Sequence, residues 1–257
     1  MPGTPEPDLA GEAIRLLSAA EDKGISTRLI GGMAIRLITG ERLDPAFVRD
    51  IADLDFVVAR KGGSKLGELL AASGYQPEAE FNALNSARRM LFWDPAHGRQ
   101  VDVFVGGFEM CHVRPLADRL EQRPQTLPAA ELLMTKLQIV ELNAKDRADA
   151  FALLHAHEVS DADRDASGED AINMRQISFL TSRDWGLQRT FEINFERLNQ
   201  SVGELPIESR GKELIGDRIA RLRAEIDAAP KSRKWKLRDR VGERKQWYET
   251  PEEVDRA

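Results

Sequence analysis

Residues 53–58 read Asp-Leu-Asp-Phe-Val-Val, an apolar run in which two carboxylates alternate with large apolar side chains. Residues at positions i and i+2 of a β-strand project from the same face, so the run predicts a strand that presents Asp53 and Asp55 together. Two neighbouring acids on a strand are costly unless something compensates their charge. Hard cations such as Mg²⁺ are the usual compensation, because they prefer carboxylate, phosphate and water oxygens.

A third acid and a glycine pair extend this pattern. Asp102 lies in Val-Asp-Val-Phe at 101–104, and Gly31-Gly32 separate a strand-like stretch at 28–30 from a helix-like stretch at 33–39. Glycines there let the N–H groups of a helix N-terminus approach a phosphate closely. Two metal ions about 3.5–4 Å apart need more than two carboxylates. The sequence therefore predicts two Mg²⁺ ions held by Asp53, Asp55 and Asp102, opposite a phosphate at Gly31 and Gly32.

Each segment taken alone has a simpler interpretation. The glycine pair is typical of a turn, Asp53 and Asp55 are typical of an edge or surface pair, and Asp102 suits a half-buried strand with one face in water. Their order along the chain, with apolar residues beside every acid, favours the joint interpretation.

These segments resemble the nucleotidyltransferase superfamily typified by DNA polymerase beta. Its pattern is a hydrophobic residue with Gly-Gly or Gly-Ser, then Asp-hydrophobic-Asp/Glu-hydrophobic, then hydrophobic-Asp-hydrophobic, which residues 29–32, 53–56 and 101–103 match in order. Many members carry a serine where Gly32 stands, so only backbone contacts to a phosphate are expected there. The interval between Gly32 and Asp53 is a few residues long for the family, and residues 41–47 are interpreted as an inserted loop ahead of Arg49.

Two further segments resemble the AbiEii-type toxin nucleotidyltransferases, and the similarity covers about residues 26–155. Leu-Leu-Met-Thr-Lys-Leu-Gln at 132–138 and Lys-Asp-Arg-Ala-Asp at 145–149 are similar to that family's Leu-x-x-Lys-Leu and Arg-Asp-x-x-Asp segments. The resemblance implies that Lys136, Lys145 and Asp149 lie near the nucleotide. From the residues alone, Lys136 either extends its ammonium to the triphosphate or simply lays its stem along an apolar helix face.

Length and composition set the outer bounds. The chain has 257 residues, 42% hydrophobic and 31% charged, as expected of an ordinary soluble protein with one large or two modest domains. No stretch approaches 18 apolar residues, so no membrane span is expected. The start of the chain lacks the basic and apolar segments of a secretory signal. The single cysteine cannot form an internal disulfide, which agrees with the cytoplasm.

The predicted fold class is α+β. Residues 1–128 are expected to form the nucleotidyltransferase core, with a small mixed sheet and packed helices. Residues 129–228 form a helical domain that completes the nucleotide site, and residues 229–257 a basic, aromatic tail. Within the core, 106–128 is expected to be irregular, and a helix is expected over 129–142.

Charge is distributed unevenly along the chain. The net charge is −6, but residues 231–248 carry eight Lys or Arg against two acids, a local charge of +6. Basic residues interleaved with Trp235, Trp247 and Tyr248 suit an RNA backbone with stacked bases. A tail whose aromatic residues dock on the main body is an equally good interpretation.

The resulting hypothesis is a Mg²⁺-dependent enzyme that transfers a nucleoside monophosphate from a nucleoside triphosphate to a hydroxyl acceptor and releases pyrophosphate. The resemblance and the basic tail indicate RNA, especially tRNA, as the acceptor. A toxin role implies an antitoxin protein partner. The alternatives are a small-molecule nucleotidyltransferase of the antibiotic-modifying type, a protein nucleotidyltransferase, and a sensor or interaction module that binds nucleotide without turnover.

Overall fold

The computed structural model describes residues 4–250 and divides into two compact units. The first unit contains the chain up to Ile38, Arg49–Glu109 and Val113–Pro128, and the second contains Thr39–Val48, Met110–His112 and the chain from Ala129 onward. The expected inserted loop at 41–47 thus belongs to the second unit. Residues 1–3 and 251–257, at the ends of the predicted core and tail, lie outside the described residues.

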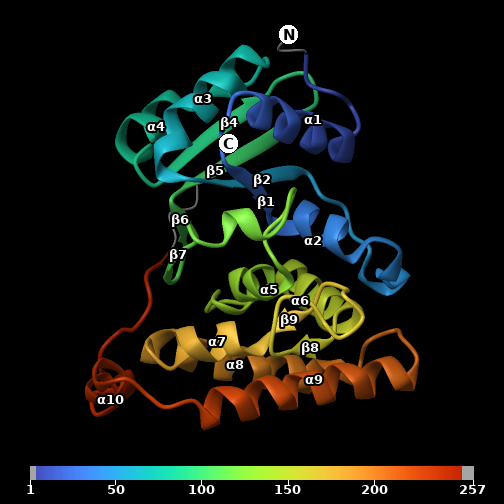
Figure 1. The fold of residues 1–257 in the computed structure, drawn as a ribbon, viewed down its shortest axis with the longest axis vertical. Coiled ribbons are helices and arrows are strands. Elements are labelled where there is room, and N and C mark those ends of the chain that lie inside the picture. Colours follow the sequence, from blue (N-terminus) through green and yellow to red (C-terminus); the bar gives the residue numbers. More distant parts are fainter. Residues whose placement is uncertain (1–3, 251–257) are drawn as a thin grey trace. The chain divides into compact units, whose positions relative to one another are not determined.

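The first unit is built on a mixed sheet in the order β1-β2-β5-β4-β3, which confirms the predicted α+β class (Figure 1). The central strands β2 and β5 are parallel, and the other neighbours are antiparallel. The strands are β1 Thr27–Ile30, β2 Asp53–Val58, β3 Gln76–Pro77, β4 Arg89–Asp94 and β5 Arg99–Val105.

Helices α1 (Leu9–Asp22) and α3 (Gly63–Ala72) lie on one face of this sheet (Figure 1). A side chain at Gly67 of α3 would contact Met90 and Phe92 of β4, and one at Gly63 would press on Val105 of β5. Val105 alternates with Asp102 along β5, and Met90 and Phe92 pair with Val103 and Val101, which flank Asp102 on the same strand. The apolar core therefore forms under α1 and α3, and the acids point to the other face.

Asp8 begins α1 as its N-cap, and its carboxylate accepts a hydrogen bond from the Gly11 N–H at 2.6 Å. The short helix α2 (Gly31–Thr39) follows β1 directly. It begins at Gly31, which has a φ of +70°, a conformation that glycine adopts without strain.

The region expected to be irregular, 106–128, contains a small hairpin of β6 (Gly107–Glu109) and β7 (Val113–Pro115). Gly107 permits this pairing, because a Cβ there would meet the backbone carbonyl of Arg114. The expectation of a wholly irregular linker was therefore wrong. Helix α4 (Ala79–Asn85) was not predicted; it is short, and Leu84 on it is exposed, so its sequence carries no apolar stripe.

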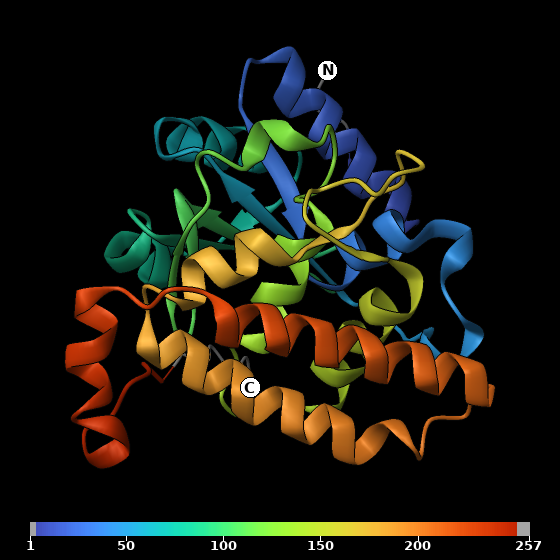
Figure 2. The same ribbon diagram turned by 60° about the horizontal axis from the view of Figure 1, so that its bottom comes forward.

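The second unit is mainly helical. Its longest helices, α8 and α9, lie side by side, as Figure 2 shows, and α7 packs against α9. The helix expected over 129–142 ends at Leu137. The elements are α5 Ala129–Leu137, α6 Ala144–Ala156, β8 Val159–Ser160, β9 Ile172–Asn173, α7 Met174–Thr181, α8 Trp185–Val202, α9 Ser209–Ala228 and α10 Arg233–Asp239. None of the helices described between residues 4 and 250 combines the length and apolar character needed to cross a membrane.

Candidate metal and nucleotide site

The strand register of the first unit brings the predicted acids to one face. Asp55 of β2 is the direct partner of Asp102 of β5, and Asp53 is the partner of Gln100. Because β2 and β5 are parallel and in register, Asp53, Asp55 and Asp102 occupy adjacent positions on the face opposite α1 and α3. Asp53 is exposed, Asp55 is half-buried and Asp102 is only 6% exposed. We call these three residues the acid face.

Asp102 is held by an arginine from the neighbouring strand β4. Arg89 donates from Nε to Asp102 Oδ1 at 2.7 Å and from Nη2 to Oδ2 at 2.9 Å, and Gln100 Nε2 donates to Oδ2 at 3.2 Å. Such two-point pairing fixes both the position and the plane of the carboxylate. Asp102 is therefore neutralised within the unit itself.

Two aromatic rings hold the guanidinium of Arg89 in place. Its Cζ lies 5.2 Å from the ring centre of Phe104 on β5 and 5.7 Å from that of Phe81 on α4. A guanidinium is attracted to the face of an aromatic ring, most strongly where water is excluded. Asn82 fixes α4 to β4, since its side-chain amide exchanges hydrogen bonds with the backbone of Leu91 at 2.7 and 2.9 Å. The unpredicted helix α4 thus positions the partner of Asp102.

The first glycine of the predicted pair lies against the acid face. A Cβ at Gly31 would overlap the carboxylate of Asp55 and come within 2.8 Å of its Cγ. Gly31 is also the first residue of α2, whose leading N–H groups have no partner within the helix. A backbone donor site and a carboxylate consequently lie next to each other, which only glycine at this position permits.

The second glycine makes room for an arginine. A Cβ at Gly32 would overlap Nη2 of Arg49 and approach its Cζ at 3.2 Å. Arg49 also donates from Nη1 to the carbonyl of Asp50 at 3.0 Å, and its own carbonyl accepts a hydrogen bond from Arg36 of α2. The sequence predicted only backbone contacts at this glycine. The structure adds the positively charged guanidinium of Arg49 beside the start of α2.

The acid face fits a hard divalent cation in some respects and not in others. Its donors are carboxylate oxygens, the ligands that Mg²⁺ prefers, and register places them side by side. Asp53 and Asp55 meet this requirement, whereas Asp102 meets it only when Arg89 releases its oxygens. Accordingly, within residues 4–250 no three His, Cys, Asp or Glu side chains are grouped so that they could hold a metal ion.

The predicted residues of the second unit form a separate ionic cluster. Lys136 on α5 lies 3.0 Å from Asp146 Oδ1 and 2.9 Å from Asp149 Oδ2, both on α6, and only 12% of its side chain is exposed. Burial by itself would lower the pKa of Lys136, but the two carboxylates outweigh burial and raise that pKa above its ordinary value. We call these three residues the lysine cluster.

Asn143 explains how the acids of the lysine cluster are positioned. Its side-chain carbonyl accepts the N–H of Asp146 at 2.9 Å and so caps α6, placing Asp146 in the first turn and Asp149 one turn later. Lys145, the remaining predicted nucleotide contact, is exposed on the same helix.

Arg89 and Arg49 are the functional candidates that the sequence did not reveal. Arg89 lies on β4, and its pairing with Asp102 depends on the register between two antiparallel strands. Arg49 was recognised only as the residue after an inserted loop. A signal for Arg89 existed in the alternation of Arg89, Leu91 and Trp93, which puts the arginine on one face of its strand.

Comparison with known proteins adds no relative: no protein-family model matches the chain, and no curated protein matches it either.

Proposed function

We propose that this protein is a Mg²⁺-dependent nucleotidyltransferase. In the proposed reaction an acceptor hydroxyl oxygen forms a bond to the α-phosphorus of a nucleoside triphosphate. The bond between the α-phosphorus and the bridging oxygen breaks, pyrophosphate leaves, and the hydroxyl proton passes to a base. The observation that carries the proposal is the register that aligns Asp53, Asp55 and Asp102 beside the glycine that begins α2.

The acid face and the start of α2 have different roles in this proposal. Asp53 and Asp55 would hold the cation, with Asp102 as a third ligand. A bound Mg²⁺ would stabilise negative charge on the phosphate oxygens and favour loss of the hydroxyl proton. The leading N–H groups of α2 would bind phosphate oxygens, and the guanidinium of Arg49 beside Gly32 would add a charged donor.

Arg89 controls whether Asp102 can take part. With both carboxylate oxygens accepting hydrogen bonds from Arg89, Asp102 is a poor metal ligand. The proposal therefore requires the guanidinium to move away, or to share Asp102, when nucleotide binds. Lys136, Lys145 and Asp149 remain candidates for nucleotide contacts, with the ammonium of Lys136 having to exchange a carboxylate for a phosphate.

The acceptor in this proposal is an RNA 3′ end, with tRNA as the first to test. A small hydroxylated compound or a protein hydroxyl is the alternative. If the enzyme is a toxin, an antitoxin protein is its expected partner.

The test uses the full chain with Mg²⁺, each α-³²P-labelled nucleoside triphosphate, and total tRNA in one set of reactions. Asp55→Asn is the test variant. Asp22→Asn on α1 is the matched control, because it removes an exposed acid on the other side of the sheet. Label on tRNA with wild type and the control, but not with Asp55→Asn, would support the proposal. Pyrophosphate release without labelled RNA would favour a small or protein acceptor.

Nucleotide binding without transfer is a second candidate, and the pairing of Asp102 with Arg89 favours it. A site of this kind would bind nucleoside triphosphate with Mg²⁺ and release no pyrophosphate with any acceptor. Equilibrium dialysis with the labelled triphosphates separates this candidate from the first.

A further inference from the structure

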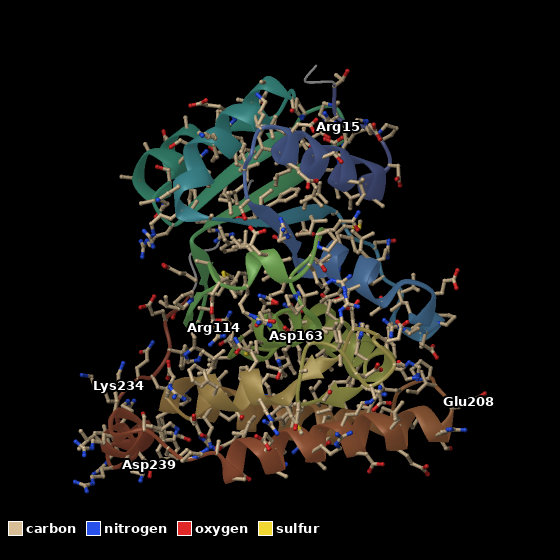
Figure 3. All side chains as sticks on the ribbon, in the orientation of Figure 1. Arg15, Arg114, Asp163, Glu208, Lys234 and Asp239 are labelled. Atoms are coloured by element: carbon tan, nitrogen blue, oxygen red, sulfur yellow. The ribbon has the colours of Figure 1, made fainter. Side chains whose placement is uncertain are left out.

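The basic segment that contains α10 turns its cations outward. Arg233, Lys236 and Arg240 are exposed and follow the i, i+3, i+7 spacing of one helix face. We call these three residues the basic face. Figure 3 shows nitrogen-tipped side chains extending outward around α10, where Lys234 and Asp239 are labelled. No ion pair of the basic face occurs among the described residues.

The two acids of the segment, Asp239 and Glu243, do not balance its eight basic residues. Asp239 accepts the indole N–H of Trp185 at 2.7 Å, and Glu243 pairs with Arg189 of α8 at 2.5 Å. The local excess of positive charge is therefore presented to solvent. Exposed cations that lack nearby acids attract polyanions and lose that attraction as salt is added.

The tryptophans of the segment dock on α8. Trp235 donates from Nε1 to Gln188 at 3.1 Å, and Trp247 donates to Thr190 at 3.2 Å. Gly186 makes the docking of Trp247 possible, since a Cβ there would lie 2.7 Å from the Trp247 carbonyl. These contacts hold the basic face in a fixed orientation on the second unit.

A cavity of about 200 Å³ lies beside α10. Its lining includes Arg183, Trp185, Lys234, Trp235, Arg238 and Trp247. The Cζ atom of Arg238 lies 4.7 Å from the ring centre of Trp185, and Asp184 also lines the space. The cavity lies on the side of α10 turned away from the basic face, so it is not part of the surface that the cations present.

We infer that the basic face binds the phosphodiester backbone of a single-stranded nucleic acid. From residue 233 to residue 240 a helix rises about 10 Å, so the three cations are spread along one side of α10. The inference concerns binding alone and goes beyond the proposed transfer reaction, so either can fail without the other.

An anionic membrane surface is the competing ligand for a basic helix, and the structure favours it less. Membrane-surface helices insert a continuous apolar face that often carries tryptophan. Here Trp235 and Trp247 are tied to α8, which leaves Leu237, 62% exposed, and Val241 as the large apolar side chains exposed on this segment.

The experiment measures fluorescence anisotropy of a labelled 20-nucleotide single-stranded RNA, and of DNA with the same sequence, at several salt concentrations. The test variant is Arg233→Ala/Lys236→Ala/Arg240→Ala in the full chain. The control, Lys61→Ala/Lys65→Ala/Arg210→Ala, removes the same charge from exposed positions outside α10. Both variants should retain the wild-type melting temperature, because exposed substitutions change stability by only about 0.5 kcal/mol.

We expect the test variant to bind at least about tenfold more weakly at low salt, and its slope of log affinity against log salt to fall by about 2, since each single-strand phosphate contact contributes about 0.7. The control should keep the wild-type slope. Similar affinity for RNA and DNA would identify backbone recognition, and a preference for RNA would add recognition of the 2′-hydroxyl. Unchanged binding by the test variant, an equal loss in the control, or binding only to phosphatidylserine vesicles would overturn the inference.

Discussion

The acid face and the lysine cluster both place aspartates beside a basic side chain, but they differ in how far their charged groups are buried. In the lysine cluster one buried ammonium contacts two carboxylates within 3.0 Å, and an N-cap fixes the helix that carries the acids. On the acid face the cation of Arg89 pairs with Asp102, while Asp53 is exposed to solvent. The lysine cluster is explained by folding, whereas the alignment of three acids on one face of a sheet needs a further reason. We propose that a bound cation is that reason.

Loss of turnover in Asp55→Asn is the largest effect we expect. Removing a carboxylate that holds the cation should slow pyrophosphate release by at least about 100-fold, because metal stabilisation contributes several kcal/mol and each 1.36 kcal/mol is about tenfold in rate. The melting temperature should not fall, since the substitution also removes repulsion between acids. Steady-state pyrophosphate assays and thermal melts check both points, and a rate within threefold of wild type would contradict the assignment.

Lys136→Met tests whether the lysine cluster stabilises the fold. Removing the ammonium leaves Asp146 and Asp149 without their cation, so the free energy of unfolding should fall by about 3–5 kcal/mol. Urea unfolding measures the loss. Lys145→Met, an exposed change on α6, is the matched control and should stay within about 0.5 kcal/mol of wild type. A loss below about 1 kcal/mol for Lys136→Met would show that the cluster is not structural.

Arg89→Gln should leave Asp102 of the acid face without the arginine that binds both of its carboxylate oxygens. Without added metal we expect a loss of about 2 kcal/mol, less than for Lys136 because Arg89 retains more exposure to solvent. Mg²⁺ should then raise the melting temperature more in this variant than in wild type, because Asp102 becomes available to the ion. Adding Asp102→Asn should abolish that gain. Equal melting temperatures in Mg²⁺ and in EDTA, with NaCl matching the ionic strength, would contradict the account.

The smallest effect is expected at Glu12, which belongs to a second group of paired side chains. This fully buried carboxylate of α1 accepts hydrogen bonds from Arg15 at 2.7 Å and from the Tyr75 hydroxyl at 2.6 Å (Arg15 is labelled in Figure 3). Burial alone would raise the pKa of Glu12, but these hydrogen bonds outweigh it and hold the pKa below its ordinary value of 4.5. Because the folded-state pKa is depressed, the stabilisation is present above pH 4.5 and is lost as the pH falls below it.

Glu12→Gln should therefore reduce the free energy of unfolding by about 1–3 kcal/mol at pH 7. The difference from wild type should shrink as the pH is lowered from 5 towards 3. Urea unfolding over that range checks the sign, and a difference that grows on acidification would show that the folded-state pKa is not depressed.

The sequence predicted the strand at 53–58 and the common face of Asp53 and Asp55, because alternation along one strand is a local property. The same reasoning placed Asp102 on a strand. The alignment of Asp55 with Asp102 could not be read locally, since register depends on how two distant strands pair. Arg89 was missed for the same reason.

For the basic segment at 231–248, docking of the aromatic residues was one of two interpretations from the sequence, and Trp235 and Trp247 do dock. Its charge was evident from composition, but the docking of Trp235 and Trp247 on α8 depends on Gly186, Gln188 and Thr190, which are remote in sequence. Helix α4 was missed because it gains its role from Phe81 and Asn82, whose partners lie on β4 and β5 and not within the helix.

The most direct test of a cation site on the acid face is a Mn²⁺ titration followed by electron paramagnetic resonance. Wild type and Asp53→Asn/Asp55→Asn are each titrated in the presence of a nucleoside triphosphate analogue with a methylene bridge between the α and β phosphates. We expect wild type to bind Mn²⁺ saturably, beyond the amount that the analogue binds by itself. We expect the variant to show no such additional binding. Equal Mn²⁺ binding by the two proteins, or none beyond the analogue by either, would contradict this expectation.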